Sequence, residues 1–193
     1  MEEKTNDNDF TDYDLKLKAV GVSQSVFVAS DYLTKYLQDD KNEFNHLGKK
    51  AFLKGEDTNK IFFVVHYVLL FMAQKVLYEG NFAGNEEKAL VFEKYLFEMF
   101  KKQTGVDPKP LFKDIFDYVG NDMSRQIKYL GSKLCRELNK QEGAIEILEI
   151  SSFFSGFLTH GGFYKSIKIA WELPNEKLEK MLKRIESNDN IKN

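Results

Sequence analysis

The side chains best suited to metal chemistry in this sequence are its three histidines, one of which stands at a metal-ligand spacing. Glu43 and His46 form a Glu-x-x-His pattern, which on a helix places a carboxylate and an imidazole on one face, as di-iron carboxylate bundles require. Those bundles need a second such pattern, and neither His66 nor His160 has a glutamate three residues before it. We therefore rank a carboxylate–metal enzyme last and predict no metal site and no cofactor.

Motifs for nucleophilic and phosphate chemistry are absent from the sequence. It contains no glycine-rich phosphate loop of the dinucleotide-binding or P-loop type and no G-x-S-x-G nucleophile elbow. The single cysteine, Cys135, borders the apolar stripe of its predicted helix, where a free thiol is expected to pack as a small hydrophobic group. The sequence thus predicts no catalytic residue and favours a protein that is not an enzyme.

His66 lies in the most apolar segment of the chain, with large apolar residues three and four positions away on both sides. One interpretation is a neutral core histidine that is hydrogen-bonded to a partner on another helix. The other is a polar anchor inside an apolar pocket that holds a lipid or a haem-like molecule. The residues proposed to form such a pocket are His66, Phe62, Phe63, Phe154 and Phe157. Both interpretations stay open at the level of sequence.

Basic residues are concentrated in the segment 121–140, where only Asp122 and Glu137 oppose them. These basic residues are Arg125, Lys128, Lys133, Arg136 and Lys140. A helix with this face could bind an acidic protein surface or a phosphate backbone, and the alternative is a solvated outer face. The net charge of the whole chain is −2, far from the basic footprint of a dedicated nucleic-acid-binding domain. Another protein is therefore the expected partner, and nucleic acid is the weaker alternative.

The stretch EISSFFSGFLTHGGFYKS, residues 149–166, combines aromatic residues with three glycines. Its apolar residues recur at helical spacing up to Gly161 and Gly162 and resume after them. This pattern predicts two helices joined by a tight turn in which at least one glycine has a positive φ. Ser152 and Gly156 are small residues four positions apart and predict the close approach of a neighbouring helix. We expect most aromatic side chains here to be buried, and Gly156→Leu to destabilise the fold by overpacking.

Helices must position these candidates, because strand patterns are scarce and only three prolines interrupt the chain. Capping residues, glycines and apolar periodicity place helices at residues 23–38, 42–53, 57–79, 86–103, 111–118, 121–140, 144–159, 163–173 and 175–187. The most apolar helix, near 57–79, is expected at the centre of the fold. The prediction is an all-α fold, a single compact bundle-like domain of about seven to nine helices.

The ends of the chain are predicted to be tails. Residues 1–14 are strongly acidic and poor in apolar side chains, which predicts a solvated, disordered segment. The helical domain is predicted to cover residues 15–188, followed by a second tail at 189–193. The longest apolar run, Ile61 to Ala73, is shorter than the roughly 20 residues of a membrane span and suits a buried helix. The acidic start has no apolar signal-peptide core, and a cytoplasmic location is expected.

The leading functional prediction is a non-enzymatic helical interaction protein, such as a regulator, adaptor, inhibitor or accessory subunit. It would bind another macromolecule through the basic helix at 121–140. The alternative from a second class is a module that binds an apolar small molecule, a lipid or a haem-like group, in the Phe-rich interior around His66. The carboxylate–metal enzyme through Glu43 and His46 comes third. The sequence does not indicate an oligomeric state.

Overall fold

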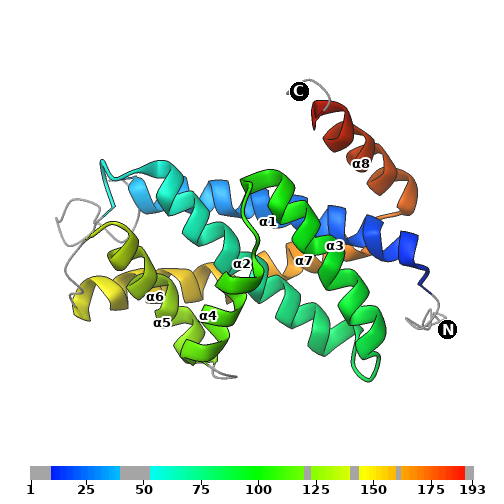
Figure 1. Ribbon diagram of the computed structural model, residues 1–193. Helices are drawn as coiled ribbons and strands as arrows, with labels where there is room; N and C mark the ends of the chain where they lie inside the picture. Colours follow the sequence, from blue (N-terminus) through cyan, green and yellow to red (C-terminus); the bar gives the residue numbers. More distant parts are fainter. Residues whose placement is uncertain (1–9, 40–52, 120–122, 140–143, 160–161, 190–193) are drawn as a thin grey trace.

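A computed structural model shows eight α-helices and no strand among the residues that it describes, which are 10–39, 53–119, 123–139, 144–159 and 162–189 (Figure 1). The helices are α1 (Asp12–Gln38), α2 (Thr58–Asn81), α3 (Glu86–Thr104), α4 (Lys109–Val119), α5 (Met123–Glu137), α6 (Ala144–Thr159), α7 (Phe163–Glu172) and α8 (Asn175–Asp189). The predicted all-α, bundle-like fold with a central apolar helix is confirmed. The predicted helix at 42–53 lies almost entirely outside the described residues.

Helix α1 begins at Asp12 because Thr11 and Asp14 form a reciprocal cap at its N-terminus. The Thr11 hydroxyl accepts a hydrogen bond from the Asp14 backbone N–H at 3.2 Å, and the Asp14 carboxylate accepts one from the Thr11 N–H at 2.9 Å. Residues 12–14, which we assigned to the acidic tail, are therefore helical. Their acidic side chains stabilise the positive end of the helix dipole instead of remaining in a solvated segment.

Helix α2 begins within one residue of its predicted start at residue 57 and ends at Asn81, two residues after its predicted end. The Asp57 carboxylate accepts hydrogen bonds from two backbone N–H groups of the first turn, at 2.9 and 3.3 Å. The helix does not stop at Gly80 but continues to Asn81. The next residue, Phe82, is buried and its ring packs against Phe92 of α3 with centroids 5.4 Å apart. This packing holds the chain in helical conformation past the glycine.

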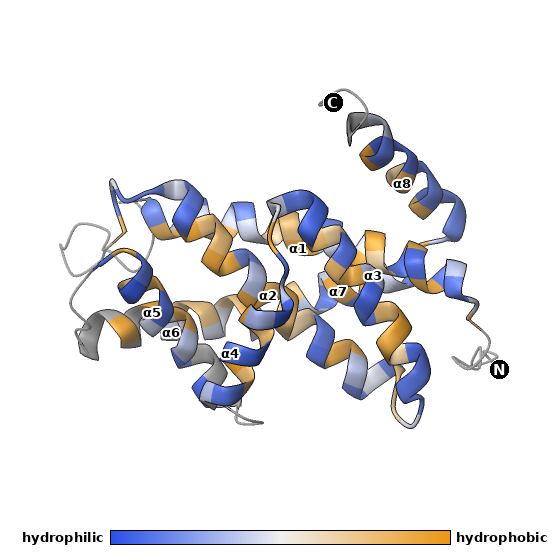
Figure 2. Ribbon diagram, in the orientation of Figure 1, coloured by the Kyte–Doolittle hydropathy of each residue, from blue (hydrophilic) through white to orange (hydrophobic). Residues whose placement is uncertain are grey.

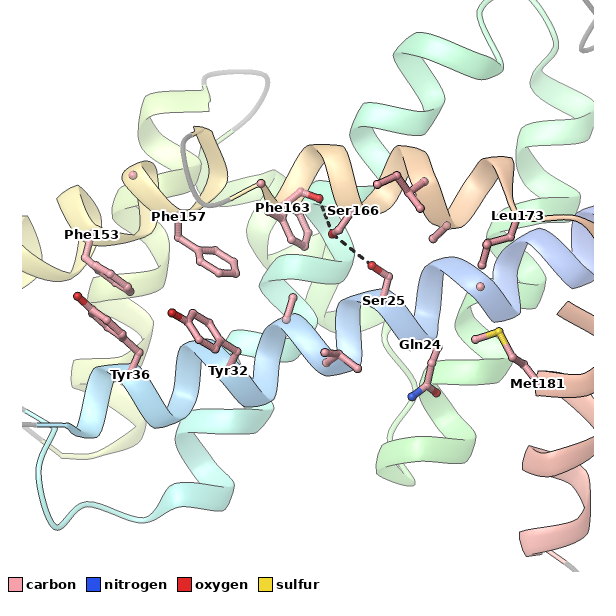
Figure 3. Close-up of a pocket in the computed structure, with 17 residues that line it drawn as sticks. Gln24, Ser25, Tyr32, Tyr36, Phe153, Phe157, Phe163, Ser166, Leu173 and Met181 are labelled. Carbon is pink, nitrogen blue, oxygen red and sulfur yellow. Dashed lines mark hydrogen bonds between the residues drawn. The ribbon is translucent and has the colours of Figure 1, made fainter. Parts of the chain in front are cut away.

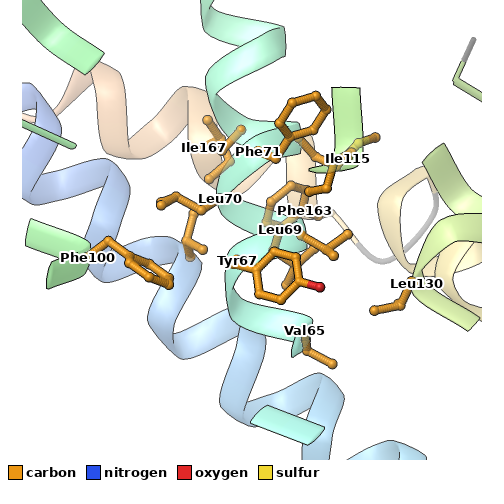
Figure 4. Close-up of a cluster of buried hydrophobic side chains, with 14 of the residues drawn as sticks. Val65, Tyr67, Leu69, Leu70, Phe71, Phe100, Ile115, Leu130, Phe163 and Ile167 are labelled. Atoms are coloured by element: carbon orange, nitrogen blue, oxygen red, sulfur yellow. The ribbon is translucent and has the colours of Figure 1, made fainter. Parts of the chain in front are cut away.

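The centre of the fold is α2, which contacts α1, α3, α4, α5 and α7. Its side chains Tyr67, Leu69 and Leu70 are fully buried and lie among residues from the surrounding helices (Figure 4). Among the described residues, α2 is also the one helix long and apolar enough to cross a membrane. Of its most apolar window, 67% is buried against other helices, and a core helix of a soluble protein meets the same criterion.

Aromatic side chains fill much of the space between the helices, whose hydrophobic residues lie mainly on the sides turned toward neighbours (Figure 2). The single tryptophan, Trp171 of α7, is only 5% exposed. Phe10, Phe82 and Phe92 meet its ring edge-to-face, with centroids 5.4 to 5.6 Å away. This aromatic cluster joins the segment before α1 to the α2–α3 turn and to α7.

Helix α8 stands apart from the other helices in Figure 1 and packs mainly on the N-terminal half of α1. Its apolar contacts form a small separate cluster of Leu17, Val20, Met99, Leu178 and Leu182. Next to this cluster, the Lys18 ammonium group donates a 2.9 Å hydrogen bond to the Leu173 carbonyl oxygen, between α7 and α8. The side-chain amide of Asn175 donates one to Asp14.

Gly21 of α1 allows two helices to approach it at once. A Cβ atom at this position would lie 2.7 Å from Leu178 Cδ2 of α8 and 3.0 Å from the carbonyl oxygen of Ala170 in α7. A second close crossing joins α5 and α6, where a Cβ atom at Gly131 would lie 3.0 Å from the Ile147 carbonyl oxygen. The close helix contacts therefore lie at these two glycines.

Candidate functional site

His66 is fully buried in α2, and both faces of its ring are covered. The rings of Phe62 and Phe100 stack on it with centroids 5.3 and 5.1 Å away and interplanar angles of 17° and 13°. Both ring nitrogens have partners on other helices. Nδ1 lies 3.1 Å from Ser30 Oγ of α1, and Nε2 lies 3.2 Å from Gln103 Oε1 of α3. This is the arrangement of a hydrogen-bonded core histidine.

The environment of His66 favours the neutral imidazole. Burial lowers the pKa of His66 to about 4, against the opposing effect of its hydrogen bond with Gln103. Nδ1 lies beside the Ser30 hydroxyl, which donates to the Val26 carbonyl oxygen 2.7 Å away, and Nε2 lies beside the Gln103 side-chain oxygen. The neutral ring thus links α1, α2 and α3 and keeps no nitrogen for an axial bond to iron.

The five residues proposed for an apolar pocket around His66 do not line one cavity. Phe62 packs on the histidine ring, and Phe63 is half-buried against Tyr67 and Phe100. Phe154 is fully buried in the core. Phe157 is 9% exposed and lines a groove on another side of α1. Sequence periodicity placed all five on apolar helix faces but did not distinguish packed rings from rings beside open space.

The basic face predicted on α5 is divided by the packing of α4. Arg125, Lys128 and Arg136 are exposed, but the Lys133 side chain is only 19% exposed. The Lys133 ammonium nitrogen lies 3.5 Å from an Asp114 carboxylate oxygen of α4 and 3.5 Å from Glu137. The remaining member of the predicted face, Lys140, lies outside the described residues. Lys133 therefore joins α5 to α4.

A hydrogen-bond chain extends this link into the core. The Tyr129 hydroxyl donates to Asp114, and it lies 3.3 Å from the Tyr67 hydroxyl of α2. The hydrogen bond from Tyr129, aided by the Lys133 charge, lowers the pKa of Asp114. Burial raises the pKa of both Tyr67 and Tyr129, so both tyrosines stay neutral. The arrangement fastens α2, α4 and α5 together.

The residues considered for a metal site can be located in the structure only in part. Glu43 and His46 lie outside the described residues. Within the described ranges, no group of three or more histidine, cysteine, aspartate or glutamate side chains is arranged to hold a metal ion. Cys135 is fully buried, as expected for a packed thiol.

An open groove of about 810 Å³ runs along α1, facing α6 and α7, with Met181 of α8 at one end (Figure 3). We call it the α1 groove. Its lining residues are Gly21, Gln24, Ser25, Val28, Ala29, Tyr32, Tyr36, Phe153, Gly156, Phe157, Gly162, Phe163, Ser166, Ile169, Ala170, Leu173 and Met181. None of them is charged, although charged residues make up 30% of the chain.

Two aromatic pairs join α1 to α6 inside the groove. The Tyr36 ring stacks on Phe153 with centroids 4.4 Å apart and an interplanar angle of 4°. The Tyr32 ring lies nearly parallel to Phe157 at 6.2 Å. In Figure 3 the two tyrosines rise from α1 toward the two phenylalanines of α6. These pairs make this end of the groove aromatic.

The two serine hydroxyls of the groove are engaged in hydrogen bonds. The Ser25 hydroxyl donates to Ser166 Oγ at 3.2 Å, and the Ser166 hydroxyl donates to the Phe163 carbonyl oxygen at 2.7 Å (Figure 3). These bonds connect α1 to the first turn of α7. The groove therefore presents mainly aromatic and aliphatic surface, and its other polar side chains are Gln24, Tyr32 and Tyr36.

Large apolar side chains also stand exposed beside the groove. Val28 is 59% exposed, Tyr32 58% and Ile169 52%. All three line the groove, so its apolar surface continues outward onto its edges. Apolar surface that forms one continuous patch marks binding sites more often than single exposed residues do.

The turn between α6 and α7 agrees with its prediction at Gly162 but not at Gly156. Gly162 has a φ of 78°, the positive value that the turn requires. Phe154, Phe157 and Phe163 are buried. A Cβ atom at Gly156, however, would meet no atom within 4 Å, because this glycine faces the α1 groove and not a neighbouring helix. The overpacking that we expected for Gly156→Leu therefore has no structural basis.

Sequence analysis missed the principal residues of the groove, although α1 contains a signal for them. Gly21, Ser25, Val28, Tyr32 and Tyr36 recur at spacings of three and four residues and form a second row beside the core stripe of α1. Together, the described helices and this row form an all-α domain with an open, uncharged groove. Comparisons with protein-family models, with curated proteins and with solved structures find no match to this chain.

Proposed function

We propose that the protein is a non-enzymatic helical interaction protein that accommodates an apolar face of a partner protein in its α1 groove. The observation that carries this proposal is the uncharged lining combined with exposed Val28, Tyr32 and Ile169 at its edges. Within the groove there is no carboxylate, imidazole, amine or thiol for acid–base or nucleophilic work. This composition supports a binding role over a catalytic one.

The exposed side chains at the edges of the groove offer enough apolar area to stabilise a protein interface when they are covered. Val28, Tyr32 and Ile169 are each slightly more than half exposed. Complete burial of a large apolar side chain stabilises an interface by about 1.5–3 kcal/mol, so covering each of these residues contributes about 1 kcal/mol or somewhat more. Three such contributions add to the contact surface that the stacked aromatic rings beside them offer.

A macromolecular partner accounts for both the groove and its edges. A small ligand inside the groove would contact Val28 and Ile169 only on the sides that line it, and their outer surfaces would stay in water. A protein surface that enters the groove also covers the side chains beside it, which removes more apolar area from water. The groove, and not the basic face of α5, is therefore the proposed binding surface, since Lys133 of that face is engaged with Asp114.

A second candidate function is the binding of an apolar small molecule such as a lipid. One observation favours it: a volume of about 810 Å³ lies within the range of roughly 300–1,000 Å³ that is usual for small-molecule sites. The position differs from the one predicted around His66, whose surroundings are filled by Phe62 and Phe100. The ligand would instead lie against Phe157 and Tyr32.

Site-specific photocrosslinking in the cells that make the protein tests the proposal. A photoreactive phenylalanine analogue at position 28 should give a discrete adduct with one protein. The same analogue at Leu90 of α3, which is 62% exposed, should not give this adduct. The purified partner should then bind the wild-type chain and lose affinity for Val28→Glu but not for Leu90→Glu.

Other outcomes decide against a protein partner. An adduct with a lipid at position 28 would support the second candidate. No adduct, or the same adducts at positions 28 and 90, would contradict binding in the groove. Circular dichroism of the two glutamate variants must match the wild type, which is expected because both positions are exposed in helices.

A further inference from the structure

We infer that the partner segment that enters the α1 groove is an amphipathic α-helix, which continues along α1 the packing that α8 already makes. This inference rests on the proposed function and specifies its partner. Two features carry it: the continuity of the groove with the α8 interface, and the mainly apolar, uncharged lining of the groove.

Helix α8 shows how the surface of α1 accepts a helix. Leu178 and Leu182 of α8 are buried against Leu17 and Val20 of α1, with Met99 of α3 beside them. The opposite side of α8 is rich in glutamate and lysine. The occupant of this part of α1 is thus an amphipathic helix that inserts leucines at four-residue spacing.

The groove begins where α8 leaves α1. Gly21 belongs to both surfaces, because it lines the groove and its Cα faces Leu178 at close range. Met181 also belongs to both, since it packs against the α8 cluster and lines the groove (Figure 3). The apolar strip of α1 is therefore continuous: α8 covers its N-terminal part, and beyond it Val28 and Tyr32 are more than half exposed.

The dimensions of the open strip suit a helix of ordinary length. Gly21 and Tyr36, the outermost groove residues of α1, are about four helical turns apart, which corresponds to about 22 Å. A partner helix of about four turns would span this length. It would meet the row of Val28 and Tyr32 with apolar side chains at spacings of three and four residues.

The chemistry of the lining distinguishes a helix from an extended segment. An extended peptide would bring its backbone N–H and C=O groups against uncharged, mostly apolar side chains. Ser25 and Ser166 cannot readily compensate, because they are already bonded to each other and to the Phe163 carbonyl oxygen. A helix satisfies its backbone groups internally, so it can be buried here without that desolvation cost.

Fluorescence polarisation with labelled synthetic peptides tests the inference on the full-length protein. One probe is a four-turn peptide of leucine, glutamate and lysine with leucines at helical spacing. Its matched control has the same composition with leucines at every second position, which favours an extended strand. We expect saturable binding of the helical probe, at least tenfold weaker binding of the control, and at least tenfold loss with Val28→Glu but not with Leu90→Glu.

Mapping the photocrosslinked segment separates this inference from the proposed function. Mass spectrometry of the position-28 adduct identifies which partner residues are attached. A segment with apolar residues at helical spacing supports the inference. An extended or proline-rich segment overturns the inference of a helix, while the proposed function stands. Stronger binding of the alternating peptide than of the helical probe also overturns the inference and leaves the proposed function standing. If neither an adduct nor peptide binding is observed, both proposals are rejected.

Discussion

The Tyr36 ring of α1 lies parallel to the Phe153 ring of α6, with centroids 4.4 Å apart and 4° between the planes. The two residues are far apart in the sequence, and their stacking closes one end of the α1 groove. Near this end the nearly parallel Tyr32 and Phe157 rings make a second bridge between the same helices. The position of α6 relative to α1 therefore depends on aromatic contacts at the groove.

Removing either ring of the first pair should destabilise the protein. We expect Tyr36→Ala and Phe153→Ala each to lower the free energy of unfolding by about 1–3 kcal/mol, measured by urea denaturation. A double-mutant cycle should give a coupling energy of about 0.5–1.5 kcal/mol for the stack. Phe116 of α4, which is 55% exposed, supplies the control: Phe116→Ala should be additive with Tyr36→Ala. A coupling energy of zero for Tyr36 and Phe153 would show that the rings do not stack in solution.

Two glycines should respond to alanine in opposite directions. At Gly21 the new methyl group would lie 2.7 Å from Leu178, so we expect overpacking to lower the melting temperature, against a gain in helix propensity. At Gly156 the methyl group enters open space within α6, so the gain in propensity should stabilise by up to about 1 kcal/mol. Differential scanning calorimetry of both variants checks this contrast. Equal shifts in one direction would contradict the assigned packing.

The buried His66 should make the fold sensitive to mild acid. Its pKa is about 4 in the folded state and about 6.5 when unfolded, so the unfolded chain binds more protons between these values. The contribution of neutral His66 to stability is complete above pH 6.5 and is lost as the pH falls toward 4. We expect this loss to reach about 3 kcal/mol.

The comparison with His66→Gln isolates this effect from other titrating groups. Glutamine retains hydrogen-bonding capacity toward Ser30 and Gln103 but does not titrate. Chemical denaturation at several pH values should show a steeper decline for the wild type than for the variant between pH 6.5 and 4. Parallel curves of stability against pH would mean that folding does not lower the pKa of His66.

Two lysines of the predicted basic face should differ in their contribution to stability. Lys133 lies between Asp114 and Glu137 and is mostly buried, whereas Lys128 is exposed. We expect Lys133→Ala to cost about 1 kcal/mol and Lys128→Ala to change stability by less than about 0.5 kcal/mol. Thermal unfolding at low ionic strength measures both. A larger effect at Lys128 would contradict the described contacts of α5.

The sequence predicted those parts of the fold that depend on local signals. The bounds of α6 and the cap at Asp57 agree with the structure because turn glycines and side-chain caps act within a few residues. The first helix was predicted to begin at residue 23, whereas α1 begins at Asp12. Residues 12–14 were taken as tail, although Thr11 and Asp14 had the spacing of a capping box. Gly80 did not end α2, because the tertiary packing of Phe82 outweighs a local preference.

The α1 groove could not be predicted in the same way. Apolar periodicity indicates which face of a helix avoids water, but it does not indicate whether a neighbouring helix arrives to cover that face. Val28 and Tyr32 therefore resemble core residues in the sequence, and their exposure of 59% and 58% depends on how far α6 and α7 lie from α1. Gly156 had the same ambiguity, since a small residue serves equally at a close contact and beside open space.

The enclosure of Trp171 gives the protein an internal optical reporter. As the single tryptophan, held at 5% exposure by three phenylalanine rings, it should emit at short wavelength in the native state and shift to the red on unfolding. Its neighbour Ala170 lines the groove, but the indole itself lies in the core. Substitutions at Val28 or Tyr32 can thus be scored for binding while tryptophan emission independently records that the core around α7 is intact.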